Sequence, residues 1–392
     1  MDNCKIVFLS NYYNHHQQFL SDALYRLTGG NYWFIETAPM TVERLQLGWG
    51  QSDSPLYVKL AYWEPEECQK LIDDADVVII GSASEKWILH RKKQRKLILR
   101  YSERPLKKGM EMQKYGYRFV KWHWRNWPNG NIHMLCASAF TAADYHKFFM
   151  YRNRCYRWGY FPECKRYDDF DRIMAEKQPK SIIWVARMID WKHPEACIAL
   201  AKRLKDENYA FELNMIGGGA LEQPLRQAIQ NNHLEDCVHL LGAMTPEEVR
   251  THMEKAEIFL FTSDRNEGWG AVLNEAMNSG CAAVASHAIG SVPFLLSDRE
   301  NGLVYRDGDM EDLYQKVKWL LAHPAEREQL GRNAYSTITE QWNAEKAADR
   351  LIRLCRALLS GEKKPELFTD GVCSKAEVLQ DDWYSKTETH YQ

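Results

Sequence analysis

The sequence lacks the patterns that are typical of proteins with a structural zinc site, a transmembrane helix or a signal peptide. Its ten cysteines are scattered, without a C-x-x-C pair or a paired histidine motif, which argues against a structural zinc site. We expect reduced thiols that pack as small apolar groups in a reducing cytoplasm. No apolar run reaches the roughly 18–20 residues that cross a bilayer. The first residues carry no basic leader, so we expect a β-strand there and not a signal peptide.

An excess of charge of either sign is also missing. The 51 lysines and arginines oppose 53 aspartates and glutamates, which leaves a net charge of −2. The chain as a whole is therefore a poor candidate for binding nucleic acid. Its 392 residues exceed one ordinary hydrophobic core, and two domains are expected.

What the sequence does contain is two series of Val-, Ile- and Leu-rich strands that alternate with helical segments. In the first half, strands are expected at 5–10, 31–36, 75–81, 96–102 and 133–138, with Asn14 capping the first helix. In the second half they are expected at 181–187, 211–217, 237–242, 257–263 and 281–286. This alternation predicts an α/β fold with two doubly wound, Rossmann-like domains facing a ligand cleft.

The domain boundaries follow from where this alternation stops and restarts. We expect an N-terminal domain at 1–165, a linker at 166–180 and a C-terminal domain at 181–342. Residues 343–392 comprise an amphipathic helix and a polar tail. We expect both to pack back on the first domain; a partly disordered tail is the alternative.

Two cations and a glycine cluster stand at strand ends of the second domain. In "VARMIDWKHPE", Arg187 ends a strand and Lys192 precedes the next helix, so both can converge on an anion such as a diphosphate. Two solvated surface charges are the alternative. In "MIGGGALE", the glycines from Gly217 onward would let the backbone approach a ligand. A simple tight turn explains that pattern equally well.

Two glutamates flank a third strand end, in "SDRNEGWGAVLNEAM". Glu267 lies on the loop and Glu275 on the following helix, while Gly268 and Gly270 leave backbone N–H groups accessible. Ionised carboxylates only accept hydrogen bonds, so they suit the hydroxyl groups of a ligand. A ligand with a central diphosphate and hydroxyl-rich ends is a nucleotide sugar.

This stretch resembles the Glu-x(7)-Glu motif of retaining, GT-B-fold glycosyltransferases of family 4, and the similarity extends from about 181 to 310. The resemblance implies that Arg187 and Lys192 hold the donor diphosphate and neutralise the leaving group. It implies that Glu275 binds the ribose and Glu267 the transferred sugar, with retention and without a metal. The resemblance makes 1–165 the acceptor-binding domain and 181–342 the nucleotide-sugar-binding domain. Substrate-binding residues are expected in the second domain at Gly217, Leu241, Met244, Gly268, Trp269, Gly270 and Glu275. In the first domain, His15, His16 and Glu103 are candidates by position, since Glu103 closes a strand that should face the cleft.

Two departures from the family pattern concern the loops. Phe294 stands where the family often has a glutamate, and "NYYNHHQQ" replaces a glycine-rich loop after the first strand. The role of His15 and His16 therefore stays open between contact with acceptor or donor and packing of their own helix.

The first domain is unusually aromatic and basic in "HRKKQRK" (90–96) and "YRFVKWHWRNW" (117–127). This composition predicts a peripheral membrane contact, where a lipid-linked acceptor would lie, or else a solvated helix end beside a buried aromatic cluster. Binding of nucleic acid through stacking is disfavoured by the overall charge. Glu103, Arg104 and His123 are further candidate acceptor contacts.

The leading hypothesis is a cytoplasmic glycosyltransferase that extends a glycan, lipid-linked or other glycoconjugate acceptor in surface polysaccharide biosynthesis. The alternatives are a nucleotide-sugar 2-epimerase, a sugar phosphorylase, or a non-catalytic member that binds sugar nucleotides. The acidic pairs at 73–76 and 307–309 look like metal ligands, but one precedes a strand and the other lies in a family loop. We therefore expect no metal and no cofactor besides the donor.

Overall fold

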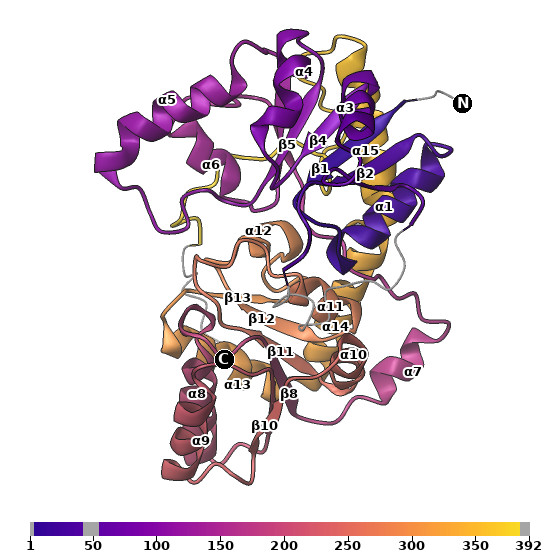
Figure 1. Cartoon of the computed structure of the whole chain (residues 1–392). Helices are drawn as coiled ribbons and strands as arrows, with labels where there is room; N and C mark the ends of the chain where they lie inside the picture. The colour runs from indigo at the N-terminus through magenta and orange to yellow at the C-terminus, as the bar shows by residue number, and fades with distance from the viewer. Residues whose placement is uncertain (1–3, 42–54, 385–392) are drawn as a thin grey trace. The chain divides into compact units, whose positions relative to one another are not determined.

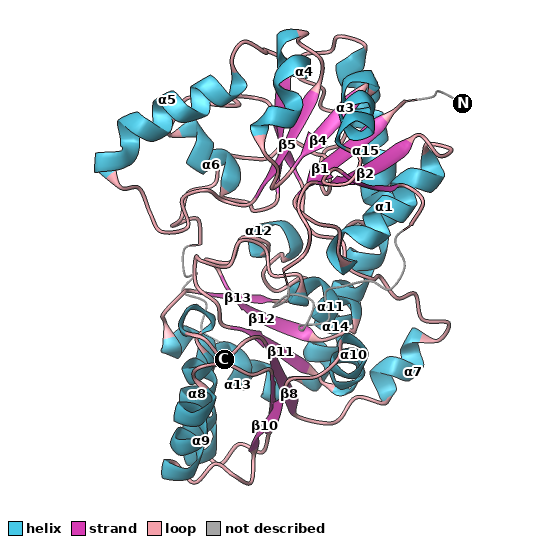
Figure 2. Cartoon of the chain, viewed as in Figure 1, coloured by secondary structure: helices cyan, strands magenta, loops and turns pink. Residues whose placement is uncertain are grey.

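The computed structural model describes residues 4–41 and 55–384, which form two compact units (Figure 1). Unit 1 comprises the chain up to residue 163 together with 342–379. Unit 2 comprises 164–341 together with the segment from 380 onward. Each unit is a parallel sheet covered by helices (Figure 2), so the predicted α/β fold with two doubly wound, Rossmann-like domains is confirmed.

Unit 1 is built on a seven-stranded parallel sheet with the order β3-β2-β1-β4-β5-β6-β7. The strands are β1 (Ile6–Ser10), β2 (Tyr32–Glu36), β3 (Val58–Leu60), β4 (Val77–Ile80), β5 (Ile98–Ser102), β6 (Ile132–Cys136) and β7 (Cys155–Arg157). Every residue of β1, β4 and β6 is buried, as expected of strands covered on both faces. The strand order reverses between β1 and β4, which is where ligands bind in sheets of this kind.

The helices of unit 1 are α1 (His15–Leu27), α3 (Pro65–Asp74), η1 (Glu85–Ile88), α4 (Leu89–Lys93), η2 (Met112–Lys114), α5 (Tyr115–Asn126), α6 (Thr141–His146) and α15 (Ala344–Leu359). Asn14 caps α1 as predicted, since its side chain accepts a hydrogen bond from the backbone N–H of His16. This cap fixes the start of α1 directly after the carboxyl end of β1.

Unit 2 has a six-stranded parallel sheet with the order β10-β9-β8-β11-β12-β13. The strands are β8 (Ser181–Val185), β9 (Glu212–Ile216), β10 (Val238–Gly242), β11 (Ile258–Phe261), β12 (Ala282–Ser286) and β13 (Leu303–Tyr305). The helices are α7 (Phe170–Ala175), η3 (Asp190–Lys192), α8 (Pro194–Asp206), α9 (Glu222–Asn231), α10 (Pro246–Lys255), α11 (Val272–Asn278), α12 (Val292–Leu295), α13 (Met310–Ala322) and α14 (Pro324–Glu340).

Residues 166–180, expected to be a linker, lie within unit 2. They include α7 and the buried Lys177, whose ammonium donates to the carbonyls of Ala256 (2.7 Å) and Ser279 (2.9 Å). Two carbonyls at the end of α10 lie slightly farther from the same nitrogen. The charge and low apolar content that suggested a linker belong instead to a segment held by polar contacts.

The C-terminal segment divides between the two units. Helix α15 packs against α1, and the chain near Cys373 exchanges two backbone hydrogen bonds of 2.8 Å with Arg157, all within unit 1. Residues 380–384 belong to unit 2, where the Trp383 indole donates to the carbonyl of His287 (3.0 Å) and Asp381 pairs with Arg265 (3.3 Å). The expected packing of the whole tail on the first domain thus differs from the structure. Residues 385–392 lie outside the described part.

All ten cysteines are free thiols and nine are buried, as predicted for small apolar groups. None of the helices in the described part of the chain has the length and apolar content to cross a bilayer.

Candidate functional site

The four charged residues singled out in unit 2 follow two neighbouring strands of the sheet. Arg187 lies two residues beyond β8 and Lys192 ends η3, while Glu267 lies in the loop after β11 and Glu275 in the first turn of α11. Because β8 and β11 pair in parallel, their carboxyl ends meet at one edge of the sheet. This edge is the candidate site.

Lys192 and Glu267 form a buried ion pair in this site. Each side chain is about one-tenth exposed, at 11% and 10%. The Ser263 hydroxyl also donates to the Glu267 carboxylate (3.2 Å), and the Lys192 ammonium lies 4.3 Å from the centre of the Trp191 ring. The Lys192 carbonyl accepts a 2.7 Å hydrogen bond from Thr262, which ties η3 to β11. Two residues 75 positions apart are thus held together as one polar group.

The Gly-Trp-Gly turn shapes the loop that carries Glu267. Gly270 has a φ of +82°, and a Cβ atom there would lie 2.3 Å from the Phe261 ring, so no other residue fits. Trp269 is fully buried, and its indole donates to the Asn274 side chain (2.9 Å). The prediction that Trp269 contacts substrate is therefore corrected for its side chain, which is a core group. Gly268 is buried as well, beside Glu267.

Arg187 differs from Lys192 because its side chain is exposed. Among the residues that the structure describes, Arg187 forms no ion pair. The loop after β9 packs tightly against the backbone just before Arg187. A Cβ atom on Gly217, which has a φ of +134°, would lie 1.9 Å from the Ala186 carbonyl oxygen. The Gly217 N–H donates to the Gly242 carbonyl (2.8 Å), which joins the ends of β9 and β10. The glycine cluster thus brings the ends of β8, β9 and β10 together.

The remaining predicted substrate-binding residues of unit 2 border the same edge. Leu241 and Met244 are half-buried at the end of β10, where the pairing with β9 is irregular. Glu275 is half-buried, and its carbonyl accepts from the Ser279 hydroxyl (2.9 Å) and from Arg250 (3.2 Å). Phe294 lies in α12 with its ring centre 6.4 Å from that of Trp269.

His193, which the sequence did not single out, also lies at this edge. It adopts a left-handed conformation with a φ of +49° between η3 and α8. Its imidazole bonds Glu195 (2.8 Å) and lies 3.5 Å from Asp264 in the Glu267 loop. Burial alone would lower the pKa of His193, but Glu195 and Asp264 outweigh burial and raise it. No sequence signal distinguishes His193 from an ordinary residue before a helix-starting proline.

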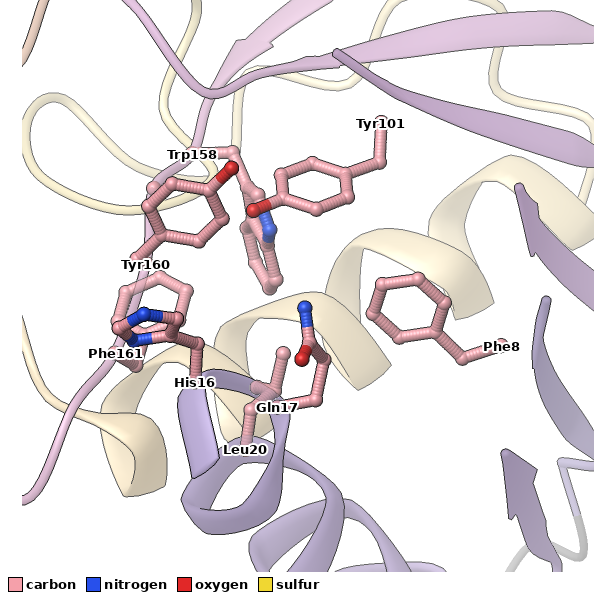
Figure 3. A pocket seen from close by; sticks show the side chains of 9 residues that line it. Phe8, His16, Gln17, Leu20, Tyr101, Trp158, Tyr160 and Phe161 are labelled. Atoms are coloured by element: carbon pink, nitrogen blue, oxygen red, sulfur yellow. The ribbon is translucent and has the colours of Figure 1, made fainter. Parts of the chain in front are cut away.

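In unit 1, a small hollow lies at the carboxyl end of the sheet (Figure 3). His16 and Gln17 of α1, Tyr101 of β5 and Tyr160 line it with polar groups, and the apolar walls are Phe8, Leu20, Trp158 and Phe161. His15 adjoins the His16 ring, 3.9 Å away between centres, and burial lowers its pKa. Glu103 accepts a 2.8 Å hydrogen bond from the hydroxyl of Tyr160, which lines the hollow.

Gln17, Tyr101 and Tyr160 were missed by sequence reasoning. The buried Gln17 carbonyl oxygen has no hydrogen-bond partner among the described residues, which marks it as available to a ligand. The position of Gln17 directly after His16 was the one sequence signal that could have pointed to it. Tyr160 follows a strand too short to recognise from the sequence.

Several basic residues of the first domain have structural partners instead of exposed positions. Arg91 is fully buried and donates to the carbonyls of four residues: Ile72, Ala75, Asp76 and Leu97. Arg104 pairs with the buried Asp144, and the His123 imidazole lies 2.9 Å from the Phe148 carbonyl oxygen. The predictions that Arg104 and His123 contact an acceptor, and that Arg91 faces a membrane, are therefore corrected.

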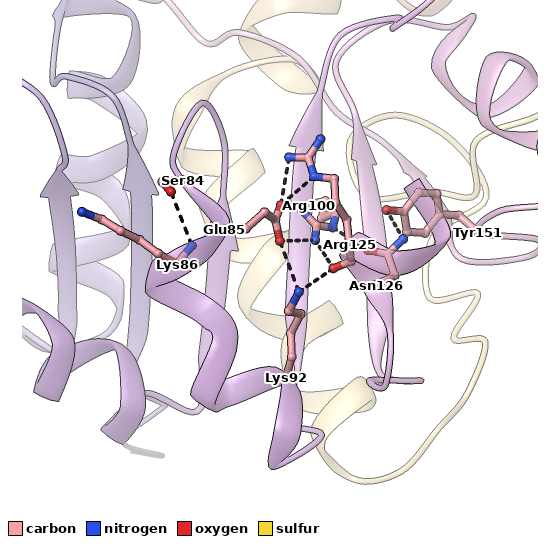
Figure 4. A network of polar contacts seen from close by, with 8 residues as sticks. All are labelled: Ser84, Glu85, Lys86, Lys92, Arg100, Arg125, Asn126 and Tyr151. Atoms are coloured by element: carbon pink, nitrogen blue, oxygen red, sulfur yellow. Dashed lines mark hydrogen bonds and ion pairs between the residues drawn. The ribbon is translucent and has the colours of Figure 1, made fainter. Parts of the chain in front are cut away.

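Lys92 belongs to a polar network under α5 (Figure 4). Glu85 accepts from Arg100 (2.7 Å) and from Arg125 (2.9 Å), and Lys92 lies 3.6 Å from the same carboxylate. Lys92 and Arg100 also donate to the Arg125 carbonyl, at 2.9 and 3.0 Å. Three cations thus share one carboxylate and hold the end of α5.

No cluster of three or more His, Cys, Asp or Glu side chains that could hold a metal ion occurs in residues 4–41 and 55–384. In the two acidic pairs, Asp76 accepts from the Lys5 N–H (2.8 Å) and Asp307 lies 3.3 Å from the Ser286 hydroxyl. That the chemistry needs no metal stays a prediction.

Comparison with known proteins finds relatives of unit 2. Residues 166–337 match the family model described as glycosyl transferases group 1. The amylovoran biosynthesis glycosyltransferase AmsK of Erwinia amylovora is 36% identical over 144 residues, which cover 36% of this chain and 35% of that protein. The putative colanic acid biosynthesis glycosyltransferase WcaL of Escherichia coli K12 is 30% identical over 150 residues, 37% of either protein. The matches thus span well under half the length of these relatives.

Solved structures resemble the chain over most of its length. Anabaena HepE in complex with UDP has a TM-score of 0.67 and 13% identity, covering 90% of this chain and 100% of that one. WaaG, a glycosyltransferase involved in lipopolysaccharide biosynthesis, has a TM-score of 0.59 and 15% identity, covering 88% of this chain and 98% of that one. At these identities the likeness concerns the fold.

Proposed function

We propose, from the match of residues 166–337 to the glycosyl transferases group 1 model, that the chain is a retaining glycosyltransferase of that family. It moves a sugar from a nucleotide-diphosphate sugar to a glycan, lipid-linked or other glycoconjugate acceptor. Surface polysaccharide biosynthesis is the proposed setting, supported by the names of the amylovoran and colanic acid relatives. The assignment to family 4 is part of this proposal.

The observation that carries the proposal is the buried Lys192–Glu267 pair at the same sheet edge as the exposed Arg187, which follows β8. A buried carboxylate and ammonium need each other while no ligand is bound. A diphosphate arriving between Arg187 and Lys192 supplies a stronger anion to the lysine. Glu267 then becomes free to accept hydrogen bonds from the hydroxyls of the transferred sugar.

In the proposed reaction, Arg187 and Lys192 stabilise the negative charge that develops on the diphosphate as the sugar leaves. Glu275 accepts hydrogen bonds from the ribose, and main-chain groups between Leu241 and Met244 meet the base. Gly217, Gly268 and Gly270 let the backbone approach the donor closely. We propose that no cofactor takes part besides the donor.

We place the acceptor contacts at the hollow of unit 1. Its aromatic walls suit the C–H faces of a sugar ring, while the Gln17 amide and the tyrosine hydroxyls suit its hydroxyl groups. His15, His16 and Glu103 would contribute from the rim. The protein is proposed to work in the cytoplasm and to contact the inner face of the membrane peripherally.

A nucleotide-sugar panel tests the proposal. Thermal shifts with UDP-, GDP- and ADP-sugars should identify one donor class, and that donor should then release its nucleoside diphosphate in the presence of acceptor. Arg187→Gln should weaken the shift, whereas Lys202→Gln, at an exposed position on α8, should not. If no nucleotide sugar stabilises the protein, the proposal is wrong. Inversion at the anomeric carbon of the product would overturn its retaining part.

A further inference from the structure

Helix α5 is apolar on the face that packs into unit 1 and also on the opposite face. Its inward side chains Tyr115, Phe119 and Trp122 pack against Leu106, Phe148 and Met150. On the outward face, Tyr117, Val120 and Trp124 are each 66% exposed, and Trp127 just beyond the helix is 71% exposed. The spacing of three and four residues places them on one stripe. Surface helices normally place polar groups there.

The outward stripe is held in place by the network of Figure 4. Lys92 and Arg100 donate to the Arg125 carbonyl, Arg100 also donates to the Asn126 side chain (2.8 Å), and Asn126 donates to the Tyr151 hydroxyl (2.8 Å). The C-terminal end of α5 is therefore fixed to β5 and α4. An exposed apolar stripe on a fixed helix is a preformed surface, not a loose end of the chain.

Cations surround this stripe. Between residues 107 and 127, six lysines and arginines oppose a single carboxylate, Glu111. The exposed Lys121 ammonium lies 5.4 Å from the centre of the Tyr117 ring, and Lys114 lies one turn before Tyr117. The rest of the chain compensates this excess, because the net charge of the whole is −2. The positive charge is thus concentrated around the apolar stripe.

We propose that the outward face of α5 inserts into an anionic lipid surface. Val120, Trp124 and Trp127 would enter the headgroup boundary, where the amphipathic indole ring is favoured, and Lys114 and Lys121 would meet the lipid phosphates. This inference deepens the proposed peripheral membrane contact and does not depend on the sugar-transfer chemistry. It moves the contact away from residues 90–96, because Arg91, Lys92 and Lys96 bond carbonyl oxygens within unit 1.

Anionic lipid fits this surface better than the other candidate partners. Nucleic acid favours aromatic rings that lie along a cationic groove, whereas here they share a convex helical stripe with a valine. A second copy of the chain would bring the same excess of cations against itself. Both remain outcomes that the experiment below distinguishes.

The test is co-sedimentation of the full-length protein with phosphatidylcholine vesicles, with and without phosphatidylglycerol. Trp124→Ser/Trp127→Ser should lower binding to anionic vesicles by about tenfold or more. Lys114→Gln/Lys121→Gln should lower it severalfold and weaken its salt dependence. The matched controls are Trp63→Ser, at another tryptophan that is 75% exposed in unit 1, and Lys70→Gln at an exposed lysine of α3. Both controls should bind as the wild type does.

Unchanged vesicle binding by the double tryptophan variant overturns the proposal, as does a wild type that ignores anionic vesicles. A concentration-dependent dimer that the tryptophan variants disrupt would instead make the stripe an interface between copies. Binding of single-stranded RNA that the same variants abolish would make it a nucleic-acid surface. The thermal shift given by the nucleotide sugar should be the same in all variants, so failure here is distinguishable from failure of the proposed reaction.

Discussion

Each unit buries several cations, and two of them, Arg91 in unit 1 and Lys192 in unit 2, have different kinds of partner. Arg91 in unit 1 donates to main-chain carbonyls at the end of α3 and before β5. Lys192 in unit 2 faces the carboxylate of Glu267. Burial alone therefore does not distinguish a structural cation from one that can act on a ligand.

The difference lies in what can replace the partner. The carbonyl oxygens that accept hydrogen bonds from Arg91 belong to the backbone of unit 1, so they cannot move away without unfolding it. Burial lowers the pKa of Arg91 to about 10, yet it stays charged at neutral pH. The carboxylate of Glu267 sits on a loop side chain, so an incoming phosphate can take its place at Lys192.

The largest effect on activity is expected when the Lys192–Glu267 ion pair of unit 2 is broken. Lys192→Met should lower kcat by about 10²–10³, because charge on the leaving diphosphate loses a preorganised partner. It should also destabilise the protein, since Glu267 is left buried without a cation. The double variant Lys192→Met/Glu267→Gln should recover melting temperature but not turnover. Recovered turnover would contradict the assigned role of Lys192.

Removing the buried guanidinium of Arg91 in unit 1 should lower the stability of the protein and leave its catalytic activity intact. Arg91→Met removes donors to four carbonyls and should lower the free energy of unfolding by about 3 kcal/mol or more. Lys93→Met, at the exposed position two residues on, should stay within about 0.5 kcal/mol. Urea unfolding monitored by circular dichroism measures both. Equal effects in the two variants would mean that Arg91 is not structural.

His133 of unit 1 should make the stability of the protein sensitive to acid. Burial lowers the pKa of His133 on β6 to about 4, and its Nδ1 atom has no hydrogen-bond partner in the described part of the chain. The unfolded state then binds this proton first, so stability is full above about pH 6.5 and falls as the pH drops toward 4. The loss should reach roughly 3 kcal/mol below pH 4.

The variant His133→Gln should flatten this dependence of the unfolding free energy on pH. The control His90→Gln concerns an exposed histidine of the same unit and should leave the pH dependence in place. A wild-type protein whose stability is constant between pH 7 and pH 4 would contradict the assignment.

Within unit 2, substitutions should also distinguish the role of Glu267 from that of Glu275. Glu275→Gln should weaken binding of the free nucleoside diphosphate and of the whole donor by roughly 1–3 kcal/mol, through a lost charged hydrogen bond to the ribose. Glu267→Gln should leave binding of the diphosphate near normal and depress kcat, because its contacts strengthen in the transition state. Calorimetric titration with both ligands separates the roles. Equal loss of diphosphate affinity would mean that the residues are misplaced along the ligand.

The smallest expected effect is that of a chelator. Since Arg187 and Lys192 are proposed to neutralise the diphosphate, EDTA should leave the rate of donor turnover unchanged. Activity that EDTA abolishes and Mn²⁺ restores would contradict the metal-independent mechanism.

The longer elements could be predicted from the sequence because each strand is a continuous apolar run between helical segments. Strands β3, β7 and β13 have three residues each and show no periodicity to detect. Arg187, Lys192, Glu267 and Glu275 were found because they follow strand ends, which meet at one edge in any doubly wound sheet.

What stayed hidden depends on partners that are distant in the sequence. Arg91 looks like its exposed neighbour Lys93 until the carbonyls of α3 are placed around it. Trp269 lies inside the recognised motif but fills the core, since Asn274 occupies its one polar atom. The hollow of unit 1 combines residues from β1, α1, β5 and the segment after β7, so no local sequence pattern predicts it.

Neither unit is a continuous stretch of chain, and this sets an order of events on the ribosome. Residues 164–341 emerge before α15, which packs against α1 and pairs with it through Arg26 and Glu345. The α1 side chains Leu20, Ala23 and Leu24 are buried in the finished protein. While unit 2 is being synthesised, the α15-facing part of α1 has no cover. Completion of unit 1 therefore waits for translation of nearly the whole chain, a vulnerable interval for a nascent protein.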